Sequence, residues 1–561
     1  MRTIRLHLAY QNIKRLKNII SVFLKHGFHP LLERLHLLRL LSMTQRLTGK
    51  KIAREQAELT LAVRTRLAME ELGPTFIKFG QILSTRPDIL PEEFVTEFLK
   101  LQDEVPPVPF GEITAVMEME FKKPFSELFS SIEETPIAAA SIAQVHRAIT
   151  HSGDEVVVKV QRPGIEKTIE TDISILGYLA KAVARHIPES RIYDPSGMVD
   201  EFSRVIKREL DFTLEASYTQ KFRDNFANDP RVEIPAIHWD MTTRRVLTMG
   251  RVEGIKVDRV GALKERGINT AKVAHLMAEV FFKQVFELGL FHGDLHSGNI
   301  FVISEDKIAL VDFGIVGRVR NEMKARLADI LICFAKDDFE GLTRVYMKMG
   351  ILPEGIDRAS FESDYYDTML HYFGRPLKHV KIGELMMDYI RMAGRHSIRF
   401  PSELLLFNKC LIELEGLARV LYPDVDILAE SEPYAARLVK ERIGPASVLK
   451  DAAKSLADYK ELVEEVPAEI RRIMKKISGD RLRIEFMHKG LEEFMGEIDR
   501  SSNRLTFGII VAALVIGSSL VVSSRSASAV MGYPSLGVIG FIIASVLGLW
   551  LIIQILRSGK F

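Results

Sequence analysis

The chain has 561 residues, which is long enough for more than one domain and a large hydrophobic core. Its formal net charge is only +2, so no global basic field points to nucleic acid as a partner. The two cysteines, Cys333 and Cys410, lie in apolar helical contexts. They make neither a disulfide framework nor a zinc site, and they fit a reducing, cytosolic environment. We expect no cleavable signal peptide, because charged residues interrupt the apolar residues of the N-terminal stretch.

The first 54 residues are strongly basic, with leucine and isoleucine recurring at steps of three and four. This pattern is typical of a helix that lies on an anionic membrane surface. Helices that pack on the protein and expose a basic face would show the same pattern, so both interpretations stay open. The positive charges are Arg2, Arg5, Lys14, Arg15, Lys17, Lys25, Arg34, Arg39, Arg46, Lys50, Lys51 and Arg54.

Two helices are predicted after this basic segment. The first is amphipathic, covers residues 56–72 and stops at a Gly-Pro pair. The second ends near Arg86 and carries Lys78, Gly80 and Gln81 close together. Helix propensity does not explain a glycine among polar residues inside an apolar helix, because glycine costs stability there. The segment therefore indicates a close approach or a functional site.

A loop of small residues lies between two predicted strands, after a proline-rich break and a short helix. The loop comprises Ala138, Ala139, Ala140 and Ser141. It stands where nucleotide-binding kinases have a glycine-rich loop over the phosphates, but alanine resists positive φ. We therefore expect a stiffer loop. The following strand places Lys159 between valines, at the position of a phosphate-pairing lysine, although a lone lysine in a strand is usually just an exposed residue.

Helices are then predicted over residues 166–187 and 195–225. The acids of interest in the second helix are Glu209, Asp211 and Glu215. Any of them could be a solvated charge, but one is needed to pair with Lys159, because a buried ammonium without a partner is costly. The strand at residues 246–254 is predicted to be the hinge between two lobes, and a helix over residues 270–288 follows it.

The stretch at residues 291–317 carries the strongest chemical signal. Asp294 is followed five positions later by Asn299, then by two short apolar strands and an Asp-Phe-Gly sequence at Asp312. A phosphoryl-transfer site needs one carboxylate near the attacking oxygen, and an amide oxygen with a second carboxylate to hold Mg²⁺. A hairpin with acidic turns is the alternative. The order and spacing of these three side chains favour the catalytic interpretation.

The C-terminal part changes composition abruptly. A charged helical stretch over residues 430–500 is followed by two uncharged runs, at residues 505–522 and 536–556. Each run is long enough, or nearly so, to span a bilayer core of about 30 Å. Arginine and lysine flank the outer ends, and only Arg525 lies in the turn, so the positive-inside rule puts both ends in the cytoplasm. A buried core hairpin is the weaker alternative.

Taken together, these segments resemble the UbiB-type atypical kinase family, also called AarF-type, over roughly residues 61–426 and the membrane tail of its bacterial members. The motifs that carry the resemblance are Lys78-Phe79-Gly80-Gln81, AAAS at Ala138–Ser141, VVVK ending at Lys159, ELDFTLEA at Glu209–Ala216, HGDLHSGN at His292–Asn299, the Asp-Phe-Gly at Asp312 and the LEGLARVLYPD helix. Many members have prolines in the catalytic loop where this chain has Leu295 and Ser297. The acid and the Asn are retained, but loop rigidity can differ.

The resemblance implies an α+β, two-lobed protein-kinase-like fold with a helical N-terminal extension and a C-terminal transmembrane hairpin. It implies that ATP and Mg²⁺ are the cofactors, with the small-residue loop at Ala138, Ala139, Ala140 and Ser141 near the phosphates. The implied catalytic residues are Asp294, Lys159 and Glu215, of which Lys159 also contacts the phosphates, and the implied metal ligands are Asn299 and Asp312. The implied regulatory residues are Lys78, Gln81, Glu209 and Asp211, which pack over the site and obstruct a protein substrate.

The expected organisation is a basic helical segment (1–60), a helical extension (61–135), an N-lobe (136–250), a C-lobe (251–430), a charged connector (431–500) and two transmembrane helices (501–561). Members of the family are linked to ubiquinone biosynthesis and behave like lipid-stimulated ATPases. We therefore expect ATP hydrolysis or phosphoryl transfer at the cytoplasmic face of the inner membrane, with membrane lipids and isoprenoid-quinone precursors or biosynthetic enzymes as partners. A nucleotide-sensing scaffold and a small-molecule or lipid kinase are the alternatives, and homodimerisation stays open.

Overall fold

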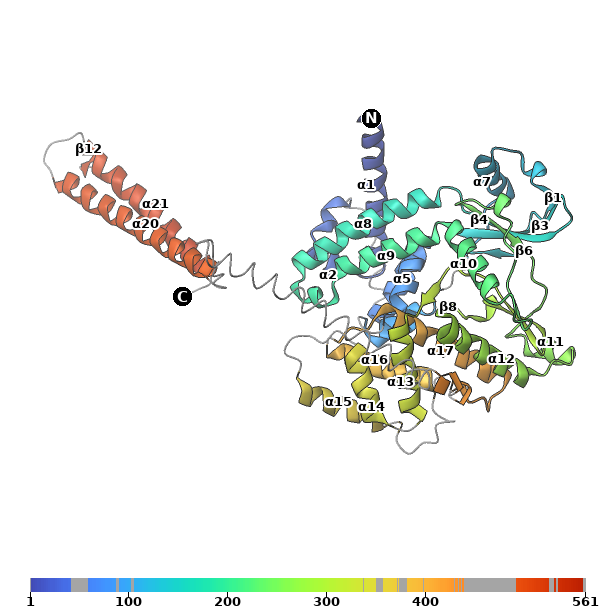
Figure 1. Cartoon of the computed structure of the whole chain (residues 1–561). Coiled ribbons are helices and arrows are strands. Elements are labelled where there is room, and N and C mark those ends of the chain that lie inside the picture. Colours follow the sequence, from blue (N-terminus) through green and yellow to red (C-terminus); the bar gives the residue numbers. More distant parts are fainter. Residues whose placement is uncertain are drawn as a thin grey trace, which may run out of the picture. The chain divides into compact units, whose positions relative to one another are not determined.

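The computed structural model describes residues 2–41, 59–86, 90–101, 105–335, 338–349, 357–370, 372, 381–396, 398–427, 429–431, 433, 434, 436, 437, 491–523, 529, 530 and 533–557. The chain forms two compact units, Met1–Leu449 and Lys450–Phe561 (Figure 1). The first unit combines helices and strands in an α+β fold with two lobes, and the second is a helical hairpin. Most of the expected charged connector, residues 431–500, lies outside the described residues.

The N-lobe is built on a five-stranded antiparallel sheet, in which β1, β3, β4 and β6 are neighbours and β2 pairs with β3. The strands are β1 (Phe129–Ile132), β2 (Ala138–Ala139), β3 (Ala143–Thr150), β4 (Glu155–Gln161) and β6 (Val246–Gly250). In β4, Val156, Val158 and Val160 are fully buried and form one cluster with residues of helix α7 (Phe110–Phe121). Because side chains alternate along a strand, Lys159 projects from the opposite face of the sheet.

Helices cover that opposite face. They are α1 (Arg2–Lys25), α4 (Leu61–Leu72), α5 (Pro74–Ser84), α6 (Glu92–Phe98), α8 (Ile165–His186), α9 (Pro195–Glu209) and α10 (Phe212–Asn225), whereas α2 (His29–Arg34) packs with α1 and α8 in a separate cluster. Their apolar side chains, among them Phe76, Phe202 and Phe212, share one core with Leu247 of β6. This core holds the N-terminal extension against the sheet (Figure 1).

The single helix expected over residues 195–225 is wrong, because the chain breaks between α9 and α10. Asp211 leaves the helical conformation, with φ −116° and ψ 92°, and its carboxylate accepts a hydrogen bond from Thr213 N at 3.1 Å. An Asp in this geometry is a strong N-cap, which offsets the lost helical continuity. The break places Glu209 at the end of α9 and Glu215 in the first turn of α10. The two acids therefore contact different parts of the structure.

The C-lobe holds the catalytic stretch on short strands beside a bundle of helices. The strands are β5 (Val232–Glu233), β7 (Ile255–Lys256), β8 (Leu290–His292), β9 (Ile300–Ser304), β10 (Lys307–Leu310) and β11 (Val316–Arg318). The helices are α11 (Val260–Glu265), α12 (Thr270–Phe282), a π-helical turn (Lys283–Leu288), α13 (Asn321–Ala335), α14 (Phe339–Met349), α15 (Arg358–Leu370), α16 (Ile382–Arg395) and α17 (Ser402–Leu421).

The strand expected over residues 246–254 ends at Gly250, because only β6 pairs with the N-lobe sheet, and residues 251–254 join it to β7 of the C-lobe sheet. The C-lobe core is rich in aromatic rings. Phe281 and Phe407 stack with ring centroids 5.8 Å apart, and Phe291 meets both edge-on. Strand β8 and helix α17 therefore share one core beside the loop that joins β8 to β9.

Helix α1 packs on the protein through the part whose side chains are described. Ile19, Ile20, Val22 and Leu24 are each at most 6% exposed. For this part of the basic segment, the structure agrees with the alternative of helices packed on the protein. Arg15 fixes the helix, since its Nε lies 2.7 Å from Asp172 Oδ1 on α8 and its Nη2 donates to Leu72 O at 2.9 Å.

Replacing Arg15 by Ala should lower the free energy of unfolding by about 3 kcal/mol, because it leaves the fully buried carboxylate of Asp172 without its ion-pair partner. The measurement is urea unfolding of the detergent-solubilised chain, followed by circular dichroism. Arg34→Ala is the control, since the Arg34–Glu189 pair is exposed at both ends and should contribute well under 1 kcal/mol. Equal losses in the two variants would contradict the importance assigned to the buried pair.

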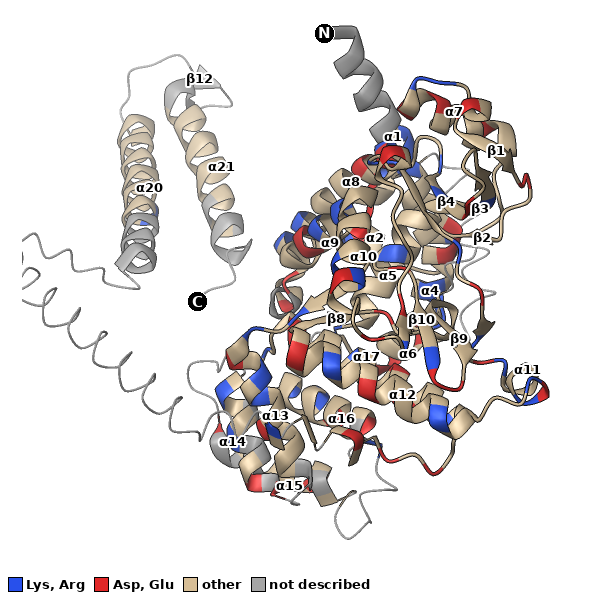
Figure 2. Ribbon diagram, turned by 45° about the vertical axis from the view of Figure 1, so that its right-hand side comes forward, with Lys and Arg blue, Asp and Glu red and all other residues tan. Residues whose placement is uncertain are grey.

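The second unit consists of α20 (Leu491–Ser523) and α21 (Ser535–Arg557), joined through the short pair β12 (Ala529–Val530) and β13 (Tyr533–Pro534). The parts of α20 and α21 that Figure 2 does not draw in grey are almost entirely tan, because few residues in those parts carry charge. They pack closely: a Cβ on Gly540 would lie 2.0 Å from Ser518 Oγ. Small residues let two helix backbones approach in this way.

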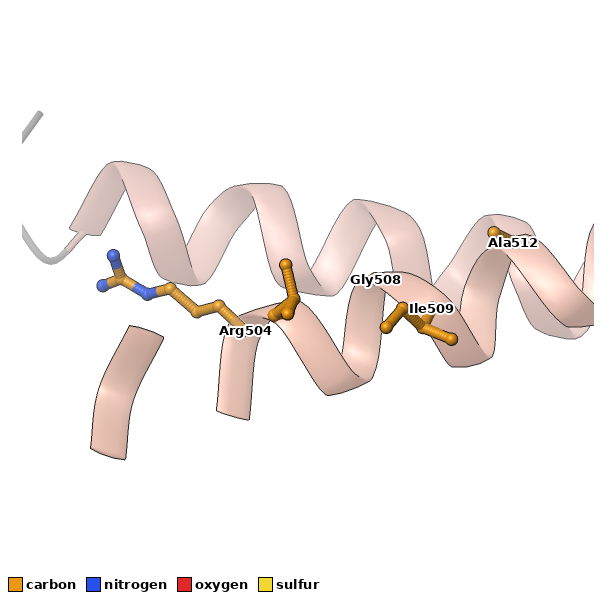
Figure 3. A pocket seen from close by; sticks show the side chains of 5 residues that line it. Arg504, Gly508, Ile509 and Ala512 are labelled. Carbon is orange, nitrogen blue, oxygen red and sulfur yellow. The ribbon is translucent and has the colours of Figure 1, made fainter. Parts of the chain in front are cut away.

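One helix in the described part of the chain, over Ser502–Ser523, is long and apolar enough to cross a membrane. The apolar part of α21, Gly537–Trp550, is shorter, so the second predicted span does not meet the same criterion within the described residues. An open groove on α20 is lined by Arg504, Leu505, Gly508, Ile509 and Ala512 (Figure 3). Apart from Arg504 its lining is apolar, so it offers no cluster of catalytic groups.

Candidate active site

Lys159 lies between two carboxylates from different parts of the chain. Its Nζ is 3.0 Å from both carboxylate oxygens of Glu215 on α10 and 3.3 Å from Asp312 Oδ2, just beyond β10. The ring centroid of Phe212 lies 5.4 Å from the same ammonium. The strand, the helix and the Asp-Phe-Gly turn therefore meet at one side chain, and the structure brings together three of the residues singled out from the sequence.

The charges in this cluster are unbalanced, because one ammonium faces two carboxylates. Burial works to lower the pKa of Lys159, but Asp312 and Glu215 together raise it, so the ammonium stays charged. Burial raises the pKa of Glu215 to about 7, against the opposing effect of Lys159 and with the help of the Asp312 charge. Burial would also raise the pKa of Asp312, but Lys159 and the Gly314 N–H hold it at about 2.

Asp312 adopts a conformation that is uncommon for a residue with a side chain. Its φ is 60°, in the left-handed region, and its Oδ1 accepts a hydrogen bond from Gly314 N at 3.2 Å. The next residue, Phe313, is fully buried. The centroid of its ring lies 4.5 Å from that of Phe222 on α10 and 4.9 Å from that of His292. Such backbone strain persists only where the surroundings determine it, and it is concentrated at functional sites. Here it directs the carboxylate toward Lys159.

The loop from β8 to β9 is held by hydrogen bonds to its own backbone. His292 is buried, donates from Nε2 to Val311 O at 2.9 Å and accepts at Nδ1 from Asp294 N at 3.1 Å. Burial lowers the pKa of His292, which keeps the imidazole neutral for both bonds. Asn299 donates its amide N–H to Asp294 O at 3.0 Å. The amide oxygen of Asn299 is therefore the group left to bind a cation.

Helix α17 supplies contacts to this loop that the sequence reasoning missed. Lys409 Nζ lies 2.6 Å from Asp294 Oδ1, and Glu413 Oε2 accepts from Leu295 N at 3.0 Å. The thiol of Cys410 donates to His292 O at 3.3 Å. A signal was present, because Lys409 is a charged residue in the apolar run LLLFNKCLIEL and a buried ammonium requires a partner. The sequence alone did not show which acid that partner is.

The small-residue loop is anchored from both sides. Ala138 and Ala139 pair with Val145 and Gln144 of β3, and Arg162 Nε donates to Ala140 O at 2.7 Å. Arg162 also donates to the carbonyls of Val105 and Pro106, in the proline-rich break. None of the alanines has positive φ, so the loop is unstrained without glycine. The anchoring is consistent with a stiff loop.

The segment with Lys78 is held by contacts to α9 and to Leu101. Lys78 Nζ lies 2.6 Å from Glu209 Oε1, and these side chains are only 14% and 18% exposed. Gln81 instead donates to Leu101 O at 3.1 Å, while Asp211 caps α10. A Cβ on Gly80 would lie 2.3 Å from Leu101 Cδ1, so glycine is needed for this close approach.

Helix α6, which follows α5 in the chain, connects the same segment to the C-lobe. Arg86 Nη1 lies 2.6 Å from Glu201 of α9, and Glu92 of α6 pairs with Arg391 of α16. Ion pairs therefore connect the extension to the N-lobe at one end and to the C-lobe at the other. We call residues 74–86 and 90–98 the extension strap.

The donor set fits a magnesium nucleotide. Among the described residues, no cluster of three or more His, Cys, Asp or Glu side chains could hold a metal by itself. Mg²⁺ in phosphoryl-transfer sites is commonly held by one or two protein oxygens together with substrate phosphates. Asp312 and Asn299 offer a carboxylate and an amide oxygen of this kind. A divalent cation would also offset the second carboxylate beside Lys159.

Three family models match the chain. Residues 100–346 match the ABC1 atypical kinase-like domain, residues 366–426 the UbiB helical domain, and residues 489–557 the ABC1/UbiB kinase-like C-terminal domain. With the two lobes and the Lys159 cluster, these matches define the protein as a kinase-like enzyme.

Curated relatives identify the family. A probable protein kinase UbiB from Marinobacter nauticus is 36% identical over 84% of this chain and 86% of its own length. A probable protein kinase UbiB from Pseudomonas aeruginosa is 35% identical over 81% and 85%. An uncharacterized protein in a hydrogenase 1 5′ region of Clostridium pasteurianum is 31% identical over 98% and 99%. The chain therefore belongs to the UbiB/AarF family of atypical kinases.

A search of solved structures finds a complex of Rv3197 with erythromycin from Mycobacterium tuberculosis. It is 24% identical, has a TM-score of 0.47 and covers 69% of this chain and 97% of the other.

Proposed function

We propose that the protein is a membrane-associated ATPase or phosphotransferase that binds Mg-ATP and supports isoprenoid-quinone biosynthesis. The observation that carries the proposal is the convergence of Lys159, Glu215 and Asp312 on one point. A scaffold that only senses nucleotide would not need Asp294 and Asn299 in addition. The presence of all five residues in this chain therefore favours catalysis over the scaffold alternative.

The proposed roles follow from the geometry. Lys159, held by Glu215, binds the phosphates, and the loop at residues 138–141 borders them. Asn299 and Asp312 hold Mg²⁺, which would neutralise charge on the phosphates and fix their orientation. Asp294 orients the attacking oxygen, either a water or an acceptor hydroxyl. The charged groups of Lys159, Asp294 and Asp312 would lie where charge develops in the transition state, so positioning and electrostatics would supply most of the rate enhancement.

The extension strap supports a small acceptor or water rather than a folded protein as the substrate. Its pairs Lys78–Glu209 and Glu92–Arg391 connect it to both lobes. We propose that a strap attached to both lobes restricts the access of a folded protein to Asp294. We therefore propose that hydrolysis, or transfer to a small molecule or lipid, is the reaction.

The second unit supports membrane association. The apolar helix at Ser502–Ser523 meets the length of a span, and α21 packs against it as a hairpin. Arg500 and Arg504 precede the uncharged run at residues 505–522 and Arg557 follows the run at residues 536–556, which favours a cytoplasmic kinase domain at the inner membrane. The link to quinone biosynthesis rests on the relatives named as probable protein kinase UbiB.

The test is ATP turnover by the purified full-length protein, with and without Mg²⁺, anionic liposomes and a phenolic quinone-precursor headgroup. We expect Mg²⁺-dependent turnover that rises with liposomes and with the headgroup. Transfer of radiolabel from γ-labelled ATP to the phenol would identify a kinase, whereas release of free phosphate alone would identify an ATPase. Absence of Mg²⁺-dependent turnover under all conditions would contradict the proposed function.

A further inference from the structure

Helix α17 presents three side chains to three residues of the catalytic loop. Lys409, Cys410 and Glu413 contact Asp294, His292 and Leu295 respectively. Lys409 and Glu413 are four residues apart and therefore share one face of the helix, where Nζ and Oε1 lie 3.3 Å apart. The helix thus supplies one acid–base pair that holds both the backbone and the carboxylate of the loop.

The ammonium of Lys409 is charged and close to the reaction. Asp294, which orients the attacking oxygen in the proposed mechanism, is 2.6 Å away, so the cation lies on the attacking side of the phosphoryl group. Lys159, in contrast, is bound to Glu215 and Asp312. Two lysines from different lobes would therefore flank the phosphates of a bound nucleotide. Two imidazoles also lie beside Asp294: His296 Nε2 is 3.6 Å from Oδ2, and the buried His292 accepts at Nδ1 from Asp294 N.

We propose that Lys409 is a positioning residue of the reaction, which holds the Asp294 carboxylate toward the nucleophile and adds positive charge on the attacking side. The role rests on the proposed function, since it presupposes phosphoryl transfer at Asp294. Its side chain is 23% exposed and that of Asp294 is 29% exposed, so both groups are accessible from the site. Because the charge acts where the transition state forms, its loss should lower kcat more than it raises KM for ATP.

The experiment measures Mg-ATP turnover and Mg-ATP binding for Lys409→Met and Lys409→Arg. We expect kcat to fall about 100-fold in Lys409→Met, the size typical of losing one preorganised charge or donor. KM should change far less, and Lys409→Arg should recover part of kcat because it keeps the charge. In an Asp294→Asn background, Lys409→Met should cause little further loss of the residual turnover, because the two residues act as a unit.

Lys283→Met is the matched control. Lys283, on the π-helical turn, is 24% exposed, about as much as Lys409, but its ion pair at 2.8 Å is with Asp229 and not with Asp294. It should keep wild-type turnover. Wild-type kcat in Lys409→Met, an additive loss with Asp294→Asn, or loss of Mg-ATP binding together with the fold would each overturn the role. Absence of turnover in the wild type would instead overturn the proposed function, and this role with it.

Discussion

Replacing Asp312 by Asn should abolish Mg²⁺-dependent binding of ATP while the fold persists. The substitution removes the only carboxylate in the proposed metal pair, and Mg²⁺ prefers charged oxygen ligands. Asparagine tolerates the left-handed φ of 60° at this position about as well as aspartate, so the turn should form. The loss of one of the two negative charges beside Lys159 should not destabilise the apoprotein.

Thermal unfolding in the presence and absence of Mg-ATP measures this effect. At about 100-fold excess of ligand over Kd, binding should stabilise the wild type by about 2.7 kcal/mol, and this gain should vanish in Asp312→Asn. Asp306→Asn is the control, because Asp306 is exposed in the turn between β9 and β10 and should keep the full gain. Unchanged stabilisation of Asp312→Asn by Mg-ATP would refute the metal assignment.

The sequence was most informative where spacing along the chain reflects local geometry. The alternation of valines around Lys159 predicts a strand with the lysine on one face, and the structure has this strand as β4. The order of Asp294, Asn299 and Asp312 around two apolar strands predicts a hairpin, which is formed by β9 and β10. Both features depend on contacts between neighbours in sequence, so pattern and propensity were sufficient.

The remaining features depend on contacts between distant residues. Lys409 meets Asp294 across 115 positions, and nothing near either residue in sequence indicates the other. Arg15 meets Asp172 across 157 positions, so the basic segment alone could not distinguish packing on the protein from lying on a membrane. The break at Asp211 was missed because the apolar pattern continues across it, although Asp is among the residues most preferred at an N-cap.

Replacing Lys78 by Ala should change how the protein handles nucleotide without unfolding it. Lys78 Nζ and Glu209 Oε1 are 2.6 Å apart, and both side chains are largely buried. Losing this contact weakens one end of the extension strap, while the Arg86–Glu201 and Glu92–Arg391 pairs stay. A contact worth about 1.4 kcal/mol would shift an equilibrium between closed and open strap about tenfold. We therefore expect higher basal ATP turnover and a smaller stimulation by anionic liposomes.

Lys100→Ala is the matched control, because Lys100 follows α6 and is an exposed lysine paired with Glu97. This variant should keep both the basal turnover and the response to liposomes. Circular dichroism should be near wild type in both variants, because the lobes have cores of their own. If Lys78→Ala matches the wild type in basal turnover and in liposome response, the segment is a structural helix, since a contact that restrains the site cannot be removed without shifting one of them.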